Sequence, residues 1–314
     1  GASATCVAVP PTAPRGPTSC RMLTWHQPVY VGGHYLKWAR GVPQSPWVAD
    51  GEAVGDGSVQ ASLEAVVLRQ LGADCSKLNA AGREDMDVRM LGGGRPFILE
   101  VHNPRNLPPT EEECAAMERE LEGAGDGAVT ARGLHVTDHS HYHLMHEGSA
   151  EKEKVYTALC WSERRLGPAD LARLSAVTDL VVQQATPVRV LHRRSPGTRA
   201  RTVLSMAAAP VPGAPHFFHL KLRTQAGTYI KEFVHGDFGR TRPSVGELLG
   251  CRADIMQLDV TEIDMEFGGG DGGGSGRGGG GGASNSDDGQ GGTVRVGGGE
   301  GEAAQREGKA AKLA

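Results

Sequence analysis

The sequence has few aromatic residues, 5% in all, and no closely spaced cysteine pairs. Its six cysteines are scattered along the chain without a C-x-x-C motif: Cys6, Cys20, Cys75, Cys114, Cys160 and Cys251. This spacing argues against a zinc knuckle and gives no sign of a disulfide framework. We therefore expect a reducing intracellular compartment, either the nucleus or the cytoplasm.

Long hydrophobic runs and an excess of positive charge are also missing. No apolar stretch approaches the roughly 20 residues that a membrane span requires. The net charge is −4, which argues against indiscriminate nucleic-acid binding through a uniformly basic domain. We predict a protein without a membrane span, in which local charged patches decide what is bound.

Composition divides the 314 residues into three parts. From Gly268 onward, 20 of 47 residues are glycine and none is aromatic, so this stretch cannot bury enough apolar surface to offset its ordering entropy. Residues 1–24 are rich in Ala, Pro, Thr and Ser without periodicity. We predict a disordered linker over residues 1–24, one folded domain from Trp25 to Phe267, and a disordered tail over residues 268–314.

The foldable part mixes helical and strand patterns. Residues 59–71 and 110–121 predict amphipathic helices, the second opened by Thr110 and three glutamates at its positive end. A further short helix is expected at residues 168–174. Residues 29–37 predict a hairpin around Gly32 and Gly33. Further strands are expected at residues 97–101, 129–136, 154–161, 181–190, 216–224 and 255–260.

Four charged residues alternate before the glycine run at residues 92–94: Arg83, Asp85, Asp87 and Arg89. An extended backbone would turn all four toward one side. A carboxylate held between two guanidiniums stays ionised at neutral pH, which suits a nucleophile or an electrostatic anchor. The alternative is a structural ion-pair cluster at a sheet edge. The three glycines predict a tight loop that allows close approach.

A histidine cluster follows at His135, His139, His141, His143 and His146. On a strand, His139, His141 and His143 would share one face, as metal ligands could. No carboxylate or thiolate clearly completes the set, so we favour histidines on an exposed strand and predict no metal. A zinc-dependent protein organised on these residues is the competing hypothesis.

Two later stretches carry positive charge. Residues 189–197 form the strongest basic patch, in which Arg193 and Arg194 are candidates to contact phosphates; the alternative is a solvated face. A helix-like segment then begins near Gly227 and carries Tyr229 and Lys231.

The charged loop, the 154–161 strand and the 227–231 segment together resemble the signature regions of pseudouridine synthases. The likeness is strongest to the Pus-ten family of tRNA pseudouridine synthases, in the stretches 81–97, 189–194 and 224–243, and it runs from about Tyr30 to Asp264. The resemblance implies an α+β catalytic domain with a mixed, mostly antiparallel sheet, flanking helices and a central cleft. It also implies isomerisation of uridine to pseudouridine at positions 54/55 in the TΨC loop of tRNA, by a monomer without cofactor or metal.

The resemblance assigns roles to individual residues. Asp85 takes the place of the nucleophile, Arg83 would orient the loop, and Lys231 would pair with Asp85. Tyr156 would pack against the target base and Tyr229 would line the uridine site. An aromatic face is useful because the target must leave its stack, and stacking on a ring restores about 1–3 kcal/mol per base.

Alternatives remain at three points. Asp87 is the rival nucleophile, although a structural pairing with Arg89 is the favoured role. Tyr156 would be an ordinary core tyrosine without the resemblance. The whole chain could be a catalytically idle protein that binds RNA in the same cleft. Family members generally carry an N-terminal RNA-binding domain, and nothing comparable precedes Trp25, so we expect a fragment or a divergent form.

Overall fold

The computed structural model describes residues 21–22, 25–49, 52–53, 57–124, 127–141, 145 and 152–264. The predicted linker, apart from residues 21–22, and the predicted glycine-rich tail lie outside the described residues. Within the described parts, no helix is long and apolar enough to cross a membrane.

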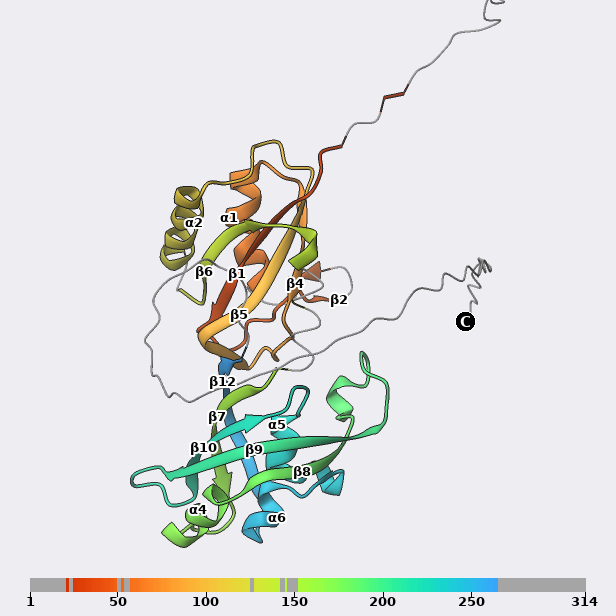
Figure 1. Ribbon diagram of the computed structural model, residues 1–314. Helices are drawn as coiled ribbons and strands as arrows, with labels where there is room; N and C mark the ends of the chain where they lie inside the picture. Colours follow the sequence, from red (N-terminus) through yellow and green to blue (C-terminus); the bar gives the residue numbers. More distant parts are fainter. Residues whose placement is uncertain are drawn as a thin grey trace, which may run out of the picture. The chain divides into compact units, whose positions relative to one another are not determined.

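In the described parts of the chain, ten strands form one mixed sheet, in the order β11-β8-β9-β10-β7-β12-β5-β1-β6, with β4 also paired to β5 (Figure 1). Among the described strands, only β5 and β12 run parallel. The strands are β1 (Val29–Lys37), β4 (Cys75–Ala80), β5 (Val88–His102), β6 (Val129–Thr137), β7 (Lys154–Ser162), β8 (Thr178–Ala185), β9 (Thr198–Pro210), β10 (Phe217–Thr224), β11 (Thr241–Arg242) and β12 (Ala253–Ile263). A separate pair joins β2 (Val48–Ala49) to β3 (Glu52–Ala53). This confirms the α+β fold with a mixed, mostly antiparallel sheet.

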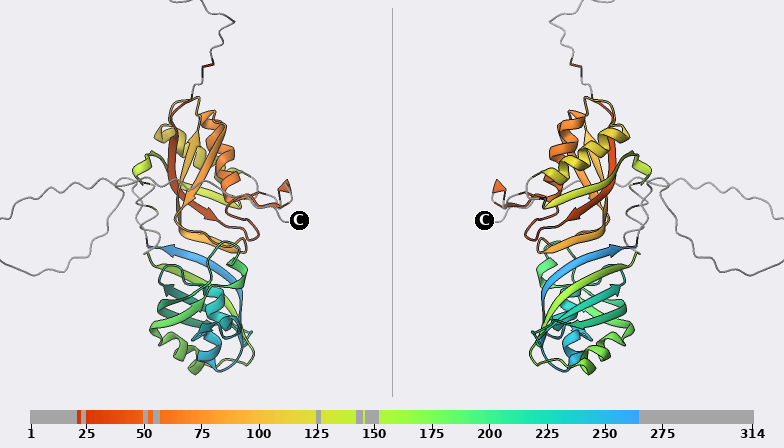
Figure 2. Two further views of the ribbon diagram at one scale, coloured as in Figure 1. Left: turned by 90° about the vertical axis from the view of Figure 1, so that its right-hand side faces the viewer. Right: turned by 90° about the vertical axis from the view of Figure 1, so that its left-hand side faces the viewer.

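The helices fall into two groups along the sheet (Figures 1 and 2). The first group packs together and against β4 and β6, and the second lies against β9 and β12. The first consists of α1 (Val59–Leu71) and α2 (Glu111–Gly123). The second consists of α4 (Pro168–Ser175), α5 (Ile230–His235) and α6 (Val245–Leu249). Two 3₁₀ turns lie between these helices in sequence: η1 (Val188–Val190) between α4 and α5, and η2 (Gly236–Gly239) between α5 and α6.

The two long helices form where local sequence predicts them. Ser58 caps α1 by accepting a hydrogen bond from the Ala61 amide at 3.0 Å. The apolar positions 59, 63, 66, 67 and 71 are all buried, as their spacing predicts. In α2, Thr110 and Glu113 form a reciprocal capping box.

The expected hairpin at residues 29–37 is wrong, because β1 is one continuous strand between β5 and β6. Gly33 serves close packing instead of a turn. A Cβ at Gly33 would lie 2.8 Å from Leu134 Cδ2 of the neighbouring strand. The alternating pattern therefore predicted strand conformation correctly, but it wrongly predicted a turn at the two glycines.

The glycine run at residues 92–94 lies inside the 15-residue strand β5 and not in a loop. Close approach is still its function. Gly92 has φ 63°, and a Cβ there would lie 1.8 Å from the carbonyl oxygen of Thr261, which follows the β12 segment paired in parallel with β5. Only glycine fits this crossing between strands.

The expected strand through the histidine cluster is also wrong. Residues 139–141 form a helical turn, and His143 and His146 lie outside the described residues. His141 contacts Asp138 at 3.3 Å, and the ring of His139 packs edge-on against Tyr30. No group of three or more metal-binding side chains occurs among the described residues.

Candidate active site

The charged stretch is a loop with a tight turn between β4 and β5, and the predicted extended alternation is wrong. The amide of Val88 donates to the carbonyl of Asp85 at 3.1 Å, which closes the turn. Arg89 already belongs to β5 and pairs with Asp259 of β12 at 2.6 Å. The turn therefore separates Asp85 and Asp87 from the arginine expected beside them.

The buried side chain of Lys37 anchors this loop. The Lys37 ammonium donates to the carbonyls of Val42 at 2.8 Å, Asp85 at 3.0 Å and Met86 at 3.4 Å. Burial lowers the pKa of Lys37, although the charge of Glu84 opposes that change. Hydrogen bonds to backbone oxygens fix the loop without occupying the Asp85 side chain.

Glu84, next to Asp85, faces the interior, where its side chain is only 1% exposed. Its carboxylate accepts from Arg95 Nε at 2.8 Å and from the Tyr35 hydroxyl at 2.9 Å, and it lies 3.8 Å from Lys37 Nζ. Burial and the negative charge of Glu84 raise the pKa of Tyr35. Arg95 also donates to the carbonyl of residue 81 at 2.7 Å. Buried charges are tolerated only when paired, and here the pairing fixes the start of the loop.

Asp85 points the other way and keeps 26% of its side chain exposed. Three cationic groups contact the carboxylate: Arg189 Nη1 at 2.6 Å, Lys231 Nζ at 3.3 Å and Arg193 Nη2 at 3.6 Å. The expected pair between Asp85 and Lys231 is present. The guanidiniums on Asp85 come from the segment after β8, however, and not from Arg83 and Arg89.

Arg189 is held in place by Glu232 of α5. Glu232 is buried and accepts from Arg189 Nε at 2.8 Å and Nη2 at 3.2 Å. Burial alone would lower the pKa of Arg189, but the hydrogen bonds to Glu232 raise it. One helical turn thus supplies both Lys231, which contacts Asp85 directly, and the carboxylate that positions Arg189.

Asp87 also contacts Lys231, whose ammonium lies 2.7 Å from each carboxylate oxygen. The expected pairing of Asp87 with Arg89 is therefore wrong. Partial burial would raise the pKa of Asp87, but the hydrogen bonds and charge of Lys231 lower it. With 61% of its side chain exposed, Asp87 is the more solvated of the two aspartates.

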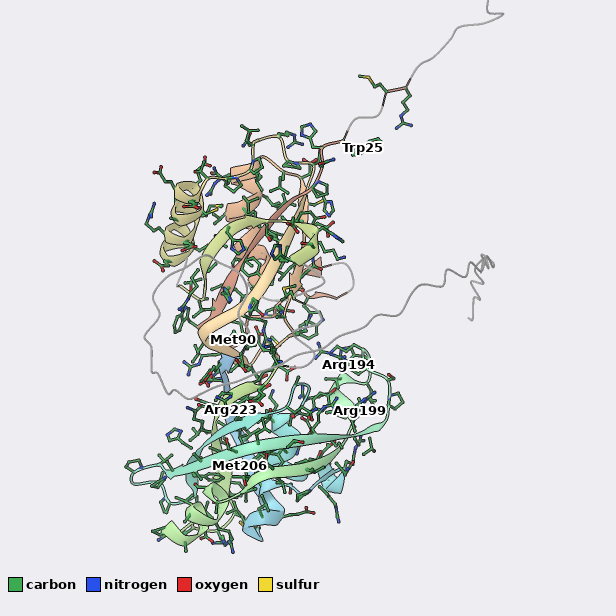
Figure 3. The ribbon with its side chains drawn as sticks, in the orientation of Figure 1. Trp25, Met90, Arg194, Arg199, Met206 and Arg223 are labelled. Carbon is green, nitrogen blue, oxygen red and sulfur yellow. The ribbon has the colours of Figure 1, made fainter. Side chains whose placement is uncertain are left out.

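Arg83 and Arg194 are exposed and form no side-chain hydrogen bond or ion pair with any described residue. Arg83 does not contact Asp85. Burial first, and the positive charge of Arg83 second, lower the pKa of Arg193. Arg194 lies on the segment between β8 and β9 (Figure 3). The surface around Asp85 therefore carries unneutralised positive charge.

The two predicted site tyrosines come from different elements and neither makes a hydrogen bond to Asp85. Tyr156 is half-buried on β7; burial raises its pKa to about 12, although Arg95 opposes the change, so the hydroxyl keeps its proton at neutral pH. Tyr229 precedes α5, and the buried amide of Gln184 bonds its backbone N–H and C=O, each at 2.9 Å. These two hydrogen bonds fix the backbone at the start of the helix that carries Lys231.

Sequence reasoning missed four residues of the site. Arg189 opens the recognised basic run, and Glu232 directly follows Lys231, so both lie inside stretches already singled out. Glu84 also lies inside a stretch already singled out, but nothing local to Glu84 or Lys37 shows that its side chain is buried.

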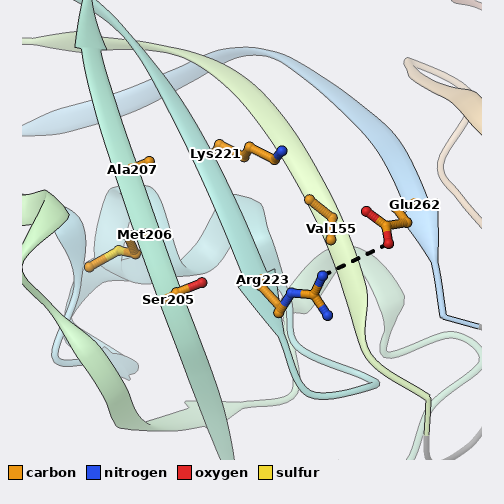
Figure 4. Close-up of a pocket in the computed structure, with 7 residues that line it drawn as sticks. All are labelled: Val155, Ser205, Met206, Ala207, Lys221, Arg223 and Glu262. Atoms are coloured by element: carbon orange, nitrogen blue, oxygen red, sulfur yellow. Dashed lines mark ion pairs between the residues drawn. The ribbon is translucent and has the colours of Figure 1, made fainter. Parts of the chain in front are cut away.

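A pocket of about 220 Å³ lies elsewhere on the sheet (Figure 4). It is lined by Val155, Ser205, Met206, Ala207, Lys221, Arg223 and Glu262. Arg223 is paired with Glu262 at 3.8 Å and with Glu153 at 3.0 Å. None of the predicted site residues lines this pocket, so it is separate from the site at Asp85.

Comparison with known proteins places the chain in a family. Residues 30–264 match the family model described as "Pus10, C-terminal". The chain is 40% identical over 261 residues to the tRNA pseudouridine synthase Pus10 of Xenopus laevis, covering 82% of this chain and 50% of that protein. The protein of the same name in Homo sapiens is 40% identical, and the alignment covers 82% of this chain and 48% of that protein. The one in Thermofilum pendens is 36% identical, and the alignment covers 76% of this chain and 53% of that protein.

A solved structure, titled "Crystal Structure of a Cbf5-Nop10-Gar1 Complex", contains a chain that is 14% identical, with a TM-score of 0.41. The alignment covers 74% of this chain and 49% of that one. The present chain spans about half the length of the curated relatives it matches. With a family match over most of its described residues, the chain belongs to the Pus10 family, in the part described as C-terminal.

Proposed function

We propose that the chain is a tRNA pseudouridine synthase in which Asp85 is the nucleophile. The arrangement of the catalytic loop carries this proposal. Buried Lys37 and Arg95 hold the loop by its carbonyls, while the Asp85 side chain faces outward among Arg189, Arg193 and Lys231. The name of the relatives, tRNA pseudouridine synthase, supports the same activity.

The reaction breaks the N-glycosidic bond of uridine, lets the uracil turn, and rejoins it to the sugar through carbon. A fixed, ionised carboxylate can attack or stabilise the separated fragments. Lys231 and Arg189 keep Asp85 oriented and supply positive charge at the point where anionic character develops. No step requires a metal or cofactor.

Recognition of the target requires its removal from the base stack. Tyr156 offers an aromatic face and a hydroxyl that remains protonated at neutral pH. Tyr229 lines the uridine site from the entry of α5, and Arg193 and Arg194 contact phosphates beside it. Arg83 takes part through the same positive surface and not through contact with Asp85.

The name of the relatives specifies tRNA as their substrate. We propose tRNA as the substrate of this chain too, with positions 54/55 in the TΨC arm as the target. The protein would act as a monomer inside the cell, in the nucleus or the cytoplasm. The four described cysteines, Cys75, Cys114, Cys160 and Cys251, are all free, which is compatible with a reducing compartment.

The proposal is tested by mapping pseudouridine in an unmodified tRNA transcript by mass spectrometry after incubation with the wild type and with Asp85→Asn. Product at 54/55 with the wild type alone is the expected result. Product at another site would correct the position and leave the activity standing. Measurable tRNA binding without product would favour the idle RNA-binding alternative.

A further inference from the structure

An exposed phenylalanine projects from the turn that follows α5. Phe238 is fully exposed, with 104% relative accessibility, and its backbone has φ 56°. Asp237 before it has φ 45°. Two consecutive non-glycine residues in the left-handed region are uncommon, and such strain persists only where surrounding contacts impose it. Neither the strain nor the solvated ring contributes to folding, so another role is indicated.

The turn is held firmly around this ring. The amide of Asp237 donates to His235 Nδ1 at 3.0 Å, and the amide of Arg240 donates to the carbonyl of Asp237 at 3.0 Å. The buried carboxylate of Asp237 lies 3.3 Å from Arg240 Nε. Gly236, in the left-handed conformation, caps α5 by donating to the carbonyl of Glu232. Phe238 is therefore presented to solvent by a fixed backbone.

The same turn adjoins the positive segment of the active site. Arg240 Nη2 donates to the carbonyl of Thr186 at 2.6 Å, and Ala185 N donates to the carbonyl of Arg240 at 3.1 Å. Three residues beyond Thr186 lies Arg189, the closest contact of Asp85. The guanidinium of Arg242 also bonds back to the turn, at Gly239, at 3.2 Å. Arg240 and Arg242 thus follow Phe238 on the same turn, and Arg242 also lies 3.5 Å from Glu247.

We propose that Phe238 stacks on an unpaired base of the RNA, at a nucleotide other than the target uridine; this inference rests on the proposed function. Lys231, which contacts Asp85, lies in the first turn of α5, whereas Phe238 lies beyond its end, and six helical residues span about 9 Å. A fully solvated ring on a fixed turn suits stacking on a splayed base.

Binding of a fluorescently labelled, unmodified tRNA transcript tests this contact. Loss of one stacked base predicts that Phe238→Ala weakens binding about 5- to 150-fold, while Phe238→Trp stays within about threefold of wild type. Leu107→Ala removes another exposed apolar side chain, 87% accessible and outside the site, and should bind like wild type. All three variants should unfold at the wild-type temperature, because these side chains are solvated.

Photo-crosslinking from p-benzoylphenylalanine in place of Phe238 identifies the occupant. The expected adduct is with a nucleotide next to, but not at, the site of modification. Wild-type affinity in Phe238→Ala, or an adduct with protein only, would overturn the inference even if pseudouridine forms. A wild type that neither binds nor modifies tRNA would overturn the proposed function as well.

Discussion

Asp85 and Asp87 both contact Lys231, but they differ in their other contacts and in the exposed fraction of their side chains. Asp85 contacts Arg189, Arg193 and Lys231, whereas among the described side chains Asp87 contacts Lys231 alone. Asp85 keeps 26% of its side chain exposed and Asp87 keeps 61%. The more enclosed carboxylate, in contact with more positive charge, is the better placed of the two to act on a bound nucleotide.

Lys154 predicts a pH effect on stability. Burial, helped by the positive charge of Arg95, lowers its pKa from 10.5 to about 8. Between these values the folded chain binds fewer protons than the unfolded chain, so the free energy of unfolding rises with pH, by at most about 3 kcal/mol. Urea unfolding of the wild type between pH 8 and 10 should show this rise.

The matched variant is Lys154→Met, which has no proton to bind at this position. Its stability should vary less with pH over the same interval. An equal slope in both proteins would show that Lys154 is not the group responsible.

At the residue scale, the resemblance implied a pair between Asp85 and Lys231, and the two side chains lie 3.3 Å apart. Local sequence could not identify Arg189 as the closest partner of Asp85, because the two residues are 104 positions apart. The sequence also gave no indication that Glu84 is buried while its neighbour Asp85 stays partly exposed. A run of charged residues has the same sequence pattern whether its side chains face the core or the solvent. The turn closed by the hydrogen bond from Val88 to Asp85 is not visible in that pattern.

At the element scale, the crossing of β5 and β12 depends on one glycine. Gly92→Ala should lower the free energy of unfolding by at least about 2 kcal/mol, because its Cβ would meet the carbonyl oxygen of Thr261 at 1.8 Å and φ is positive. Gly93→Ala is the matched control, since a Cβ there meets nothing within 4 Å. Chemical denaturation compares the two, and equal loss in both would contradict the account.

The loop anchor predicts a joint effect on stability and turnover. Lys37→Met removes three hydrogen bonds to carbonyls and one partner of a buried carboxylate, so it should cost about 3 kcal/mol. Turnover should fall more than tRNA affinity, because the loop that positions Asp85 loosens.

For comparison, Arg69→Gln breaks an exposed pair with Glu120 and should leave the free energy of unfolding close to that of the wild type. Denaturation and single-turnover kinetics give both readouts. A Lys37→Met protein as stable and active as the control would exclude the anchoring role.

The elements predicted best are those defined locally. Helix α1 has its predicted bounds, and α2 begins at its capping box, because caps and apolar spacing act within a few residues. Strand β9 was missed: its alanines and arginines have low strand propensity, and pairing with both β8 and β10 imposes the conformation. The glycines of β1 and β5 were misassigned to turns because their neighbours across the sheet are invisible in the sequence.

At the scale of the whole molecule, strand β12 joins the elements that build the site. It pairs antiparallel with β7, which carries Tyr156, and parallel with β5, which follows the loop that carries Asp85. Asp259 of β12 binds Arg89 at 2.6 Å and Arg40 at 2.6 Å, and Arg40 also donates to the carbonyl of Asp87 at 2.9 Å. Arg40 thus ties the loop to β12.

The net charge of −4 conceals a positive surface near Asp85, so tRNA affinity should fall as salt rises. Arg193→Gln should weaken binding and reduce the slope of log affinity against log salt by about 1. Arg252→Gln serves as control, because Arg252 is already paired with Glu163 at 2.9 Å. An unchanged slope in Arg193→Gln would remove Arg193 from the phosphate contacts.

The most direct test of the account compares Asp85→Asn with Asp87→Asn in single-turnover pseudouridine formation on an unmodified tRNA transcript, with tRNA affinity measured alongside. We expect Asp85→Asn to form no product while binding tRNA within a few-fold of wild type. Asp87→Asn should remain active, with a modest loss because Lys231 loses one partner. Activity retained in Asp85→Asn, or abolished only in Asp87→Asn, would contradict the assignment of Asp85 as the nucleophile.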